Sequence, residues 1–256
     1  MHSAEDIGRI REACRIAAVV LEEVCAAVKP GVSTYDLDRL AKSLMESMGA
    51  RSACYQYRSR NLVFPSHTCI SINEEVVHGI AKFQKVVREG DNITLDVAVK
   101  YEGFIGDNAR TLLVGEVSDE KELLNRVASE ALELGIAKAL PGNRVGDISS
   151  AIQKHVEKAG FGVVREFVGH GIGRTMHEEP QIPNFGRRNH GPILKTGMVL
   201  AIEPMVTAGT HRIQIQSDGW TAVTADRRPA SHFELSVLVT DDGPEVLTVP
   251  KESASS

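Results

Sequence analysis

Apolar residues recur every three to four positions at the start of the chain, which is the spacing of one face of an α-helix. Along residues 4–28 this face carries Ile7, Ile10, Cys14, Ala17 and Leu21, and the segment stops at the sequence KPG. The same spacing predicts helices from about residue 34 or 36 to 48, from 118 to 139 and from 147 to 158, each followed closely by glycine. Between them, apolar and β-branched runs such as NITLDVAV and MVLAI predict strands.

Two helical stretches 111 residues apart resemble each other. Residues 29–50, KPGVSTYDLDRLAKSLMESMGA, align without gaps with residues 140–161, LPGNRVGDISSAIQKHVEKAGF. A second echo, EGDNITLD against TGMVLAIE, places Asp96 in register with Glu203. We interpret the chain as a single catalytic domain, residues 1–256, with related halves at about 4–115 and 116–250 and a loose tail at 251–256. Chance similarity between two helical hairpins is the alternative.

Composition and charge restrict the class of protein. With 42% apolar and 25% charged residues the chain is typical of a soluble globular enzyme, and its net charge of −5 argues against nucleic-acid binding driven by bulk electrostatics. The four cysteines have no CxxC spacing, which indicates reduced thiols in a cytoplasmic protein. Neither a signal peptide nor an apolar run long enough to span a membrane is found in the first residues.

Five residues interrupt strand-like or glycine-rich runs in which their side chains are unexpected: Asp96, Asp107, His170, Glu203 and Glu234. A hairpin that turns at residues 100–103 would pair residue i with residue 203 − i, so that Asp96 lies directly opposite Asp107 on one face of the sheet. The two carboxylates would then be about 5 Å apart, at a separation where like charges destabilise a sheet.

Each carboxylate taken alone has ordinary explanations, namely exposure on an edge strand, an ion pair or protonation. Cations are scarce nearby, because residues 91–114 contain only Lys100 and Arg110 and residues 198–208 contain none. Two carboxylates 4 Å apart repel by about 4 kcal/mol at an effective dielectric constant near 20, and a divalent ion between them reverses the sign. Four carboxylates and one imidazole therefore favour two divalent ions, manganese, iron or cobalt, with zinc also compatible.

Two more histidines stand near these residues in the sequence. His78 follows SINEEVV, and His177 comes seven residues after His170 in GHGIGRTMHEEP, where the glycines predict a loop or an irregular strand. A hydrogen-bonded surface histidine is the alternative for each.

Several of these stretches together resemble the bacterial type I methionine aminopeptidases, which have the pita-bread metallopeptidase fold. They are CISINEEVVHGI, LDVAV with GFIGDNART, FVGHGIGRTMHEEP, GMVLAIEPM, DGWT and HFELSVLVTDDG, in the expected order, and the similarity runs from about residue 4 to 250. The resemblance implies an α+β fold in which two pseudo-twofold-related αβ halves surround a central curved antiparallel sheet.

The resemblance also implies a role for each site residue. Asp107 and Glu234 would bridge two metal ions, Asp96 would complete one ion, and His170 with Glu203 would complete the other. Glu203 would also carry a proton. His78 would contact the substrate near the scissile amide, and His177 would stabilise the tetrahedral intermediate.

A pocket for the methionine side chain is implied as well, with the wall residues Cys54, Phe64, Cys69, Met176 and Trp220. Soft sulfur and aromatic groups suit a thioether. Two features depart from the family, because the segment between Cys54 and Cys69 is longer than usual and Met176 stands where an aromatic residue is common. Ordinary packing is the alternative for Cys54 and Met176.

We therefore expect a cytoplasmic hydrolase that removes the initiator methionine from new proteins with a metal-bridged hydroxide and prefers a small second residue. Its cofactors would be two divalent ions (Co, Mn, Fe or Zn), and we expect a monomer with no DNA or membrane partner, with transient contact with the ribosome left open. A related peptidase of the aminopeptidase P or prolidase type is the alternative enzyme. A non-catalytic binding protein on the same fold is the alternative of another class.

Overall fold

The computed structural model describes residues 2–59 and 61–250, so the predicted loose tail at 251–256 lies outside the described residues. The helices are α1 (Ala4–Ala26), α2 (Thr34–Ser47), α3 (Asp119–Ile136) and α4 (Val145–Lys158). All four were predicted, with ends that differ by at most three residues. Ser3, Ser33 and Ser118 cap the first three helices, because each hydroxyl accepts a hydrogen bond from the backbone three residues later.

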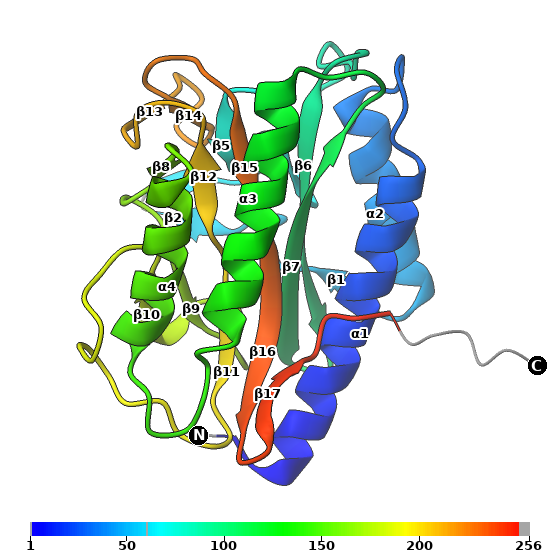
Figure 1. Ribbon diagram of the computed structural model, residues 1–256. Coiled ribbons are helices and arrows are strands. Elements are labelled where there is room, and N and C mark those ends of the chain that lie inside the picture. Colours follow the sequence, from blue (N-terminus) through cyan, green and yellow to red (C-terminus); the bar gives the residue numbers. More distant parts are fainter. Residues whose placement is uncertain (1, 60, 251–256) are drawn as a thin grey trace, which may run out of the picture.

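An antiparallel sheet forms the middle of the molecule, and α1 and α3 pack against one of its faces (Figure 1). Its strands run in the order β1 (Arg51–Ser52), β6 (Asn92–Tyr101), β7 (Phe104–Leu113), β16 (Glu234–Thr240), β11 (Val199–Ile202), β9 (Val168–Gly171) and β10 (Glu178–Pro183). In addition, β17 (Gly243–Val246) pairs with β16, and β4 (Cys69–Ile72) pairs with β6. The predicted α+β fold with a central curved antiparallel sheet is confirmed.

Smaller sheets flank the central one. They are β15 (Ala230–His232) with β12 (Met205–Thr207) and β8 (Gly162–Val163); β13 (Ile213–Ile215) with β14 (Ala222–Thr224) and β5 (Glu75–Val77); and the hairpin β2 (Arg58–Ser59) with β3 (Leu62–Val63). The hairpin falls within the long segment between Cys54 and Cys69. Within the described ranges, no helix has both the length and the apolar composition needed to cross a membrane.

The repeat in the sequence recurs in the backbone hydrogen bonds. The bounds of α2 and α4 differ by 111 residues at both ends, which is the offset of the two aligned stretches. Before α2, the Gly31 N–H donates to the Val87 carbonyl, and before α4 the Gly142 N–H donates to the Leu194 carbonyl. The donors are 111 residues apart and the acceptors 107 apart, which are the two offsets found in the sequence. The division into halves near residue 115 stays a prediction.

Each half has its own apolar core. The helices α1 and α2 pack on β6 around buried residues such as Val20, Leu37 and Leu95. The helices α3 and α4 pack on β11 and β16 around Leu124, Ile148 and similar residues. The two halves meet where β7 pairs with β16, in the centre of the sheet.

The register of the β6–β7 hairpin differs from the prediction. Tyr101 pairs with Phe104 across a two-residue turn, Glu102-Gly103, in which both residues have positive φ, +46° and +87°. Such turns match the twist of the strands that they join. Residue i therefore pairs with 205 − i, so the predicted direct pairing of Asp96 with Asp107 is wrong: Asp107 lies opposite Ala98. A shift of two residues keeps the face, and the two aspartates are diagonal neighbours on it.

Candidate metal and substrate site

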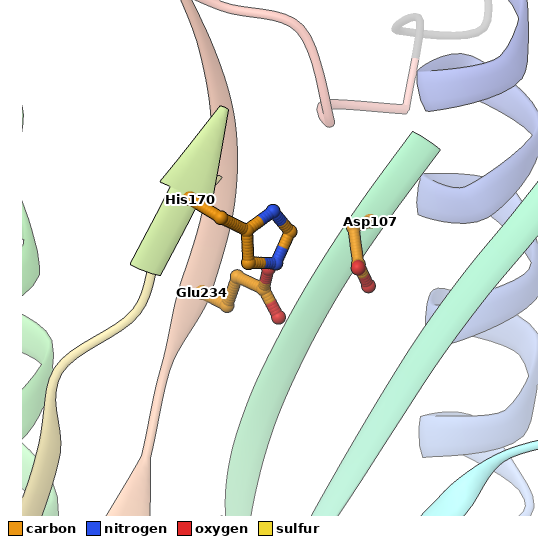
Figure 2. A group of neighbouring side chains, drawn as sticks. All are labelled: Asp107, His170 and Glu234. Atoms are coloured by element: carbon orange, nitrogen blue, oxygen red, sulfur yellow. The ribbon is translucent and has the colours of Figure 1, made fainter. Parts of the chain in front are cut away.

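Side chains from five neighbouring strands converge near the centre of the sheet. Asp96 is on β6, Asp107 on β7, Glu234 on β16 and His170 on β9, while Glu203 directly follows β11. These strands are neighbours in the order β6-β7-β16-β11-β9. Figure 2 shows Asp107, His170 and Glu234 directed toward the same space. The sheet therefore brings together the acids that lie up to 138 residues apart in the sequence.

Two overlapping groups of donor atoms form there. The donor atoms of Asp107, His170 and Glu234 lie within 4.8 Å of one another, and so do those of Glu203, His232 and Glu234. Glu203 lies between two imidazoles, 3.5 Å from His170 Nε2 and 3.6 Å from His232 Nε2. Glu234 is common to both groups, as a bridging ligand would be.

The residues present fit divalent cations. In the described part of the chain, Asp107 Oδ1, Glu234 Oε1 and both ring nitrogens of His232 are buried without a hydrogen-bond partner. Such groups are costly unless something compensates them. His170 Nδ1 lies 3.0 Å from the Gly171 carbonyl, to which it can only donate, so its Nε2 keeps a lone pair for a ligand. Carboxylates with imidazole suit manganese, iron, cobalt or zinc.

The electrostatics of the protein without a cation are unfavourable for these acids. Burial, reinforced by the neighbouring carboxylates, raises the pKa of Asp107, Glu203 and Glu234 well above their usual range. Burial also raises the pKa of Asp96 to about 7. It lowers the pKa of His170 to about 4 and that of His232 to about 3, so both imidazoles are neutral at neutral pH and can act as ligands.

A cavity of about 280 Å³ opens beside the cluster. All the residues predicted for the site line it: Asp96, Asp107, His170, Glu203, Glu234, His78, His177, Cys54, Phe64, Cys69, Met176 and Trp220. The structure therefore brings the whole predicted set together, while the role of each residue stays a prediction.

One wall of the cavity is apolar. Cys54, Phe64 and Cys69 are buried in one cluster, against which Met176 and Trp220 pack. The rings of Phe64 and Trp220 meet edge to face, with centroids 5.3 Å apart. Polar and apolar lining groups thus occupy different sides of one cavity, as in sites that orient a small ligand.

Sequence reasoning missed two side chains of the site, His232 and Tyr57. His232 was detectable, because it precedes Glu234 by two positions and alternation in an extended chain places both on one face. Tyr57 lines the cavity, and its hydroxyl lies 3.0 Å from His177 Nδ1. No periodicity pointed to Tyr57, since it belongs to the long segment between Cys54 and Cys69.

Comparisons with known proteins agree with this geometry. A family model described as metallopeptidase family M24 matches residues 8–241. The methionine aminopeptidase of Clostridium acetobutylicum is 47% identical over 244 residues, which cover 95% of this chain and 96% of that protein. The crystal structure of methionine aminopeptidase from Thermotoga maritima superposes with a TM-score of 0.93 at 42% identity and covers 97% of this chain and 98% of that one.

A prolidase from Pyrococcus furiosus is a more distant structural neighbour. It is 22% identical with a TM-score of 0.77, and the match covers 98% of this chain and 66% of the prolidase. At this identity the likeness shows a shared fold and nothing about substrate.

Proposed function

This chain belongs to metallopeptidase family M24, and from that premise we propose that it is a methionine aminopeptidase that hydrolyses the N-terminal methionine of new polypeptides. One observation carries the proposal: a cluster of four carboxylates and a histidine adjoins an apolar, sulfur- and aromatic-lined wall in the same cavity. The first group suits hydrolysis of an amide, and the second suits a thioether side chain.

We infer that Asp96, Asp107, His170, Glu203 and Glu234 hold two divalent ions, cobalt, manganese, iron or zinc. The orphaned oxygens of Asp107 and Glu234 support this assignment. Divalent ions bound there supply Lewis-acid charge, which polarises a carbonyl and lowers the pKa of water.

The remaining steps belong to side chains of the protein. Glu203, within 4 Å of both His170 and His232, accepts a proton from the attacking water and delivers it to the leaving amine. His177 donates a hydrogen bond to the negative charge that develops on the carbonyl oxygen. His78, whose ring meets Phe167 edge to face at 5.0 Å, contacts the substrate beside the scissile amide.

The apolar wall sets specificity in this proposal. The methionine side chain packs among Cys54, Phe64, Cys69, Met176 and Trp220, and a small second residue is preferred. We also propose that the enzyme works in the cytoplasm as a monomer, on polypeptides that still carry the initiator methionine.

Peptide hydrolysis with defined metals tests the function. The protein is stripped with a chelator, loaded with manganese or cobalt, and given peptides that begin Met-Ala, Met-Leu and Xaa-Pro. We expect cleavage after methionine in the Met-Ala peptide, slower cleavage of Met-Leu and none before proline. Cleavage of the Xaa-Pro peptide alone would instead identify an aminopeptidase P or prolidase activity, and failure to bind either ion or cleave any peptide would identify a binding protein.

A further inference from the structure

Tyr57 reaches His177 from a segment that the rest of the site does not use. Its hydroxyl lies 3.0 Å from His177 Nδ1, and the two rings meet edge to face with centroids 5.6 Å apart. The pair lies at the exposed mouth of the cavity, where a bound peptide would cover it. Tyr57 is thus placed to act on His177 while a substrate is bound.

The backbone holds Tyr57 firmly in this place. The Tyr57 N–H donates to the Cys54 carbonyl at 2.9 Å, and the Phe64 N–H donates to the Tyr57 carbonyl at 2.9 Å. Tyr57 therefore stands at the base of the β2–β3 hairpin, opposite a residue of the apolar wall. The hairpin fixes one side chain on each of the two functional sides of the cavity.

The protonation of His177 follows from this contact. Partial burial lowers the pKa of His177, so the ring is neutral at neutral pH and carries a single N–H. A phenol is a stronger acid than a neutral imidazole N–H, and an imidazole nitrogen is the better acceptor, so the Tyr57 hydroxyl donates to Nδ1. The proton of His177 must then be on Nε2, on the other side of the ring.

The position of the ring makes this tautomer useful. The His177 ring meets the ring of His170, one of the proposed ligands, edge to face with centroids 4.6 Å apart. His177 therefore adjoins the place where the scissile carbonyl must lie if the proposed ligands hold the metal. A donor to a developing oxyanion must have its N–H ready before the reaction.

We propose that Tyr57 is a positioning residue that holds His177 in the tautomer protonated at Nε2, so that this N–H donates to the substrate carbonyl oxygen. This inference rests on the proposed function. In the absence of such a role Tyr57 would only be part of the cavity wall, and its hydroxyl would be dispensable.

Kinetics of Tyr57→Phe test the proposal, because this change removes the hydroxyl and keeps the ring. On a Met-Ala peptide we expect kcat to fall about 3- to 10-fold, the effect of one neutral hydrogen bond, with KM changed less than about twofold. Tyr55→Phe is the matched control, since Tyr55 stacks on His67 at 4.3 Å outside the cavity lining, and we expect parental kinetics. In a His177→Ala background, Tyr57→Phe should reduce kcat no further.

A second measurement does not depend on activity. In the zinc-loaded full-length protein with ¹⁵N-labelled histidine, NMR should show His177 protonated at Nε2, and Tyr57→Phe should shift its tautomer equilibrium toward Nδ1. An unchanged kcat or an unchanged tautomer in Tyr57→Phe would overturn the inference. If the parent cleaves no Met-Ala peptide, the proposed function fails, whereas the NMR result still decides the tautomer.

Discussion

Two carboxylate oxygens in the described part of the chain, Asp107 Oδ1 and Glu234 Oε1, are buried in the middle of the sheet without a hydrogen-bond partner. An unpaired buried carboxylate must be neutralised by a proton or by a cation. The raised pKa of Asp107 expresses the first solution, and the convergence of His170 on the same space supports the second. One residue thus serves as a probe for the metal proposal.

Asp107→Asn is expected to abolish turnover and preserve the fold. The amide has nearly the same shape but no charge, so it cannot bridge two cations, and we expect kcat to fall by more than about 100-fold, beyond the usual effect of changing a residue behind a ligand. Initial rates on a Met-Ala peptide, metal content after dialysis and circular dichroism measure the three effects. Asp242→Asn, at an exposed position, serves as the control. Near-parental activity of the Asp107→Asn variant would contradict the bridging assignment.

The acids of the site could be predicted one by one because each contradicts its local sequence. An aspartate within NITLDVAV or a glutamate after VLAI has no reason to be there in a purely structural strand. Tyr57 gave no such signal, because a tyrosine in a polar loop contradicts nothing. Its function depends on a contact with His177, which is 120 residues away, and only the folded chain supplies it.

At the scale of elements, the helices followed from apolar spacing and capping, whereas the β6–β7 register did not. Periodicity fixed the face of each strand but left the turn length open, and the two-residue turn at Glu102-Gly103 moved the pairing by two positions. The hairpin β2–β3 likewise could not be foreseen, because its strands have two residues each and too few positions to show alternation.

The contact between α1 and β7 depends on a glycine beside the site. A Cβ on Gly106 would meet the backbone of Ala13 and Cys14 in α1, and neither can turn aside as a flexible side chain could. We expect Gly106→Ala to destabilise the protein by about 3 kcal/mol and lower Tm by roughly 6–12 °C. It should also reduce activity, because Asp107 is the next residue along β7.

Gly8→Ala is the matched control for this prediction. Gly8 lies inside α1, and a Cβ there would meet nothing within 4 Å. Alanine should leave stability unchanged or raise it by about 0.5–1 kcal/mol. Thermal melts of the two variants compare them directly, and equal melting temperatures would show that α1 is free to move away from β7.

At the scale of the whole molecule, the acids of both halves face one another across the β7–β16 seam. Without a cation the folded state retains protons that the unfolded chain releases, since the pKa values of Asp96, Asp107, Glu203 and Glu234 are raised. Stability then falls as pH rises. The buried histidines act in the opposite direction, but only below their unfolded pKa of about 6.5.

The metal-free protein is therefore expected to lose stability between pH 6.5 and 8.5. Each retained proton contributes about 1.4 kcal/mol per pH unit, which corresponds to a fall in Tm of roughly 3–6 °C per unit for a chain of this size. Thermal melts in the presence of a chelator at several pH values measure the slope. Saturating manganese should raise Tm and flatten the curve, and Asp107→Asn should reduce the slope in the metal-free state. A flat curve without metal would argue against the raised pKa values.

The seam between the halves also sets the order of events during synthesis. Asp96 and Asp107 emerge from the ribosome early, but they are completed by His170, Glu203 and finally Glu234. The proposed ligand set does not exist until that last strand has been translated and has paired with β7. Cofactor capture must accordingly be a late step in maturation, and a nascent chain interrupted before residue 234 carries its acids to the centre with no means of retaining the ions.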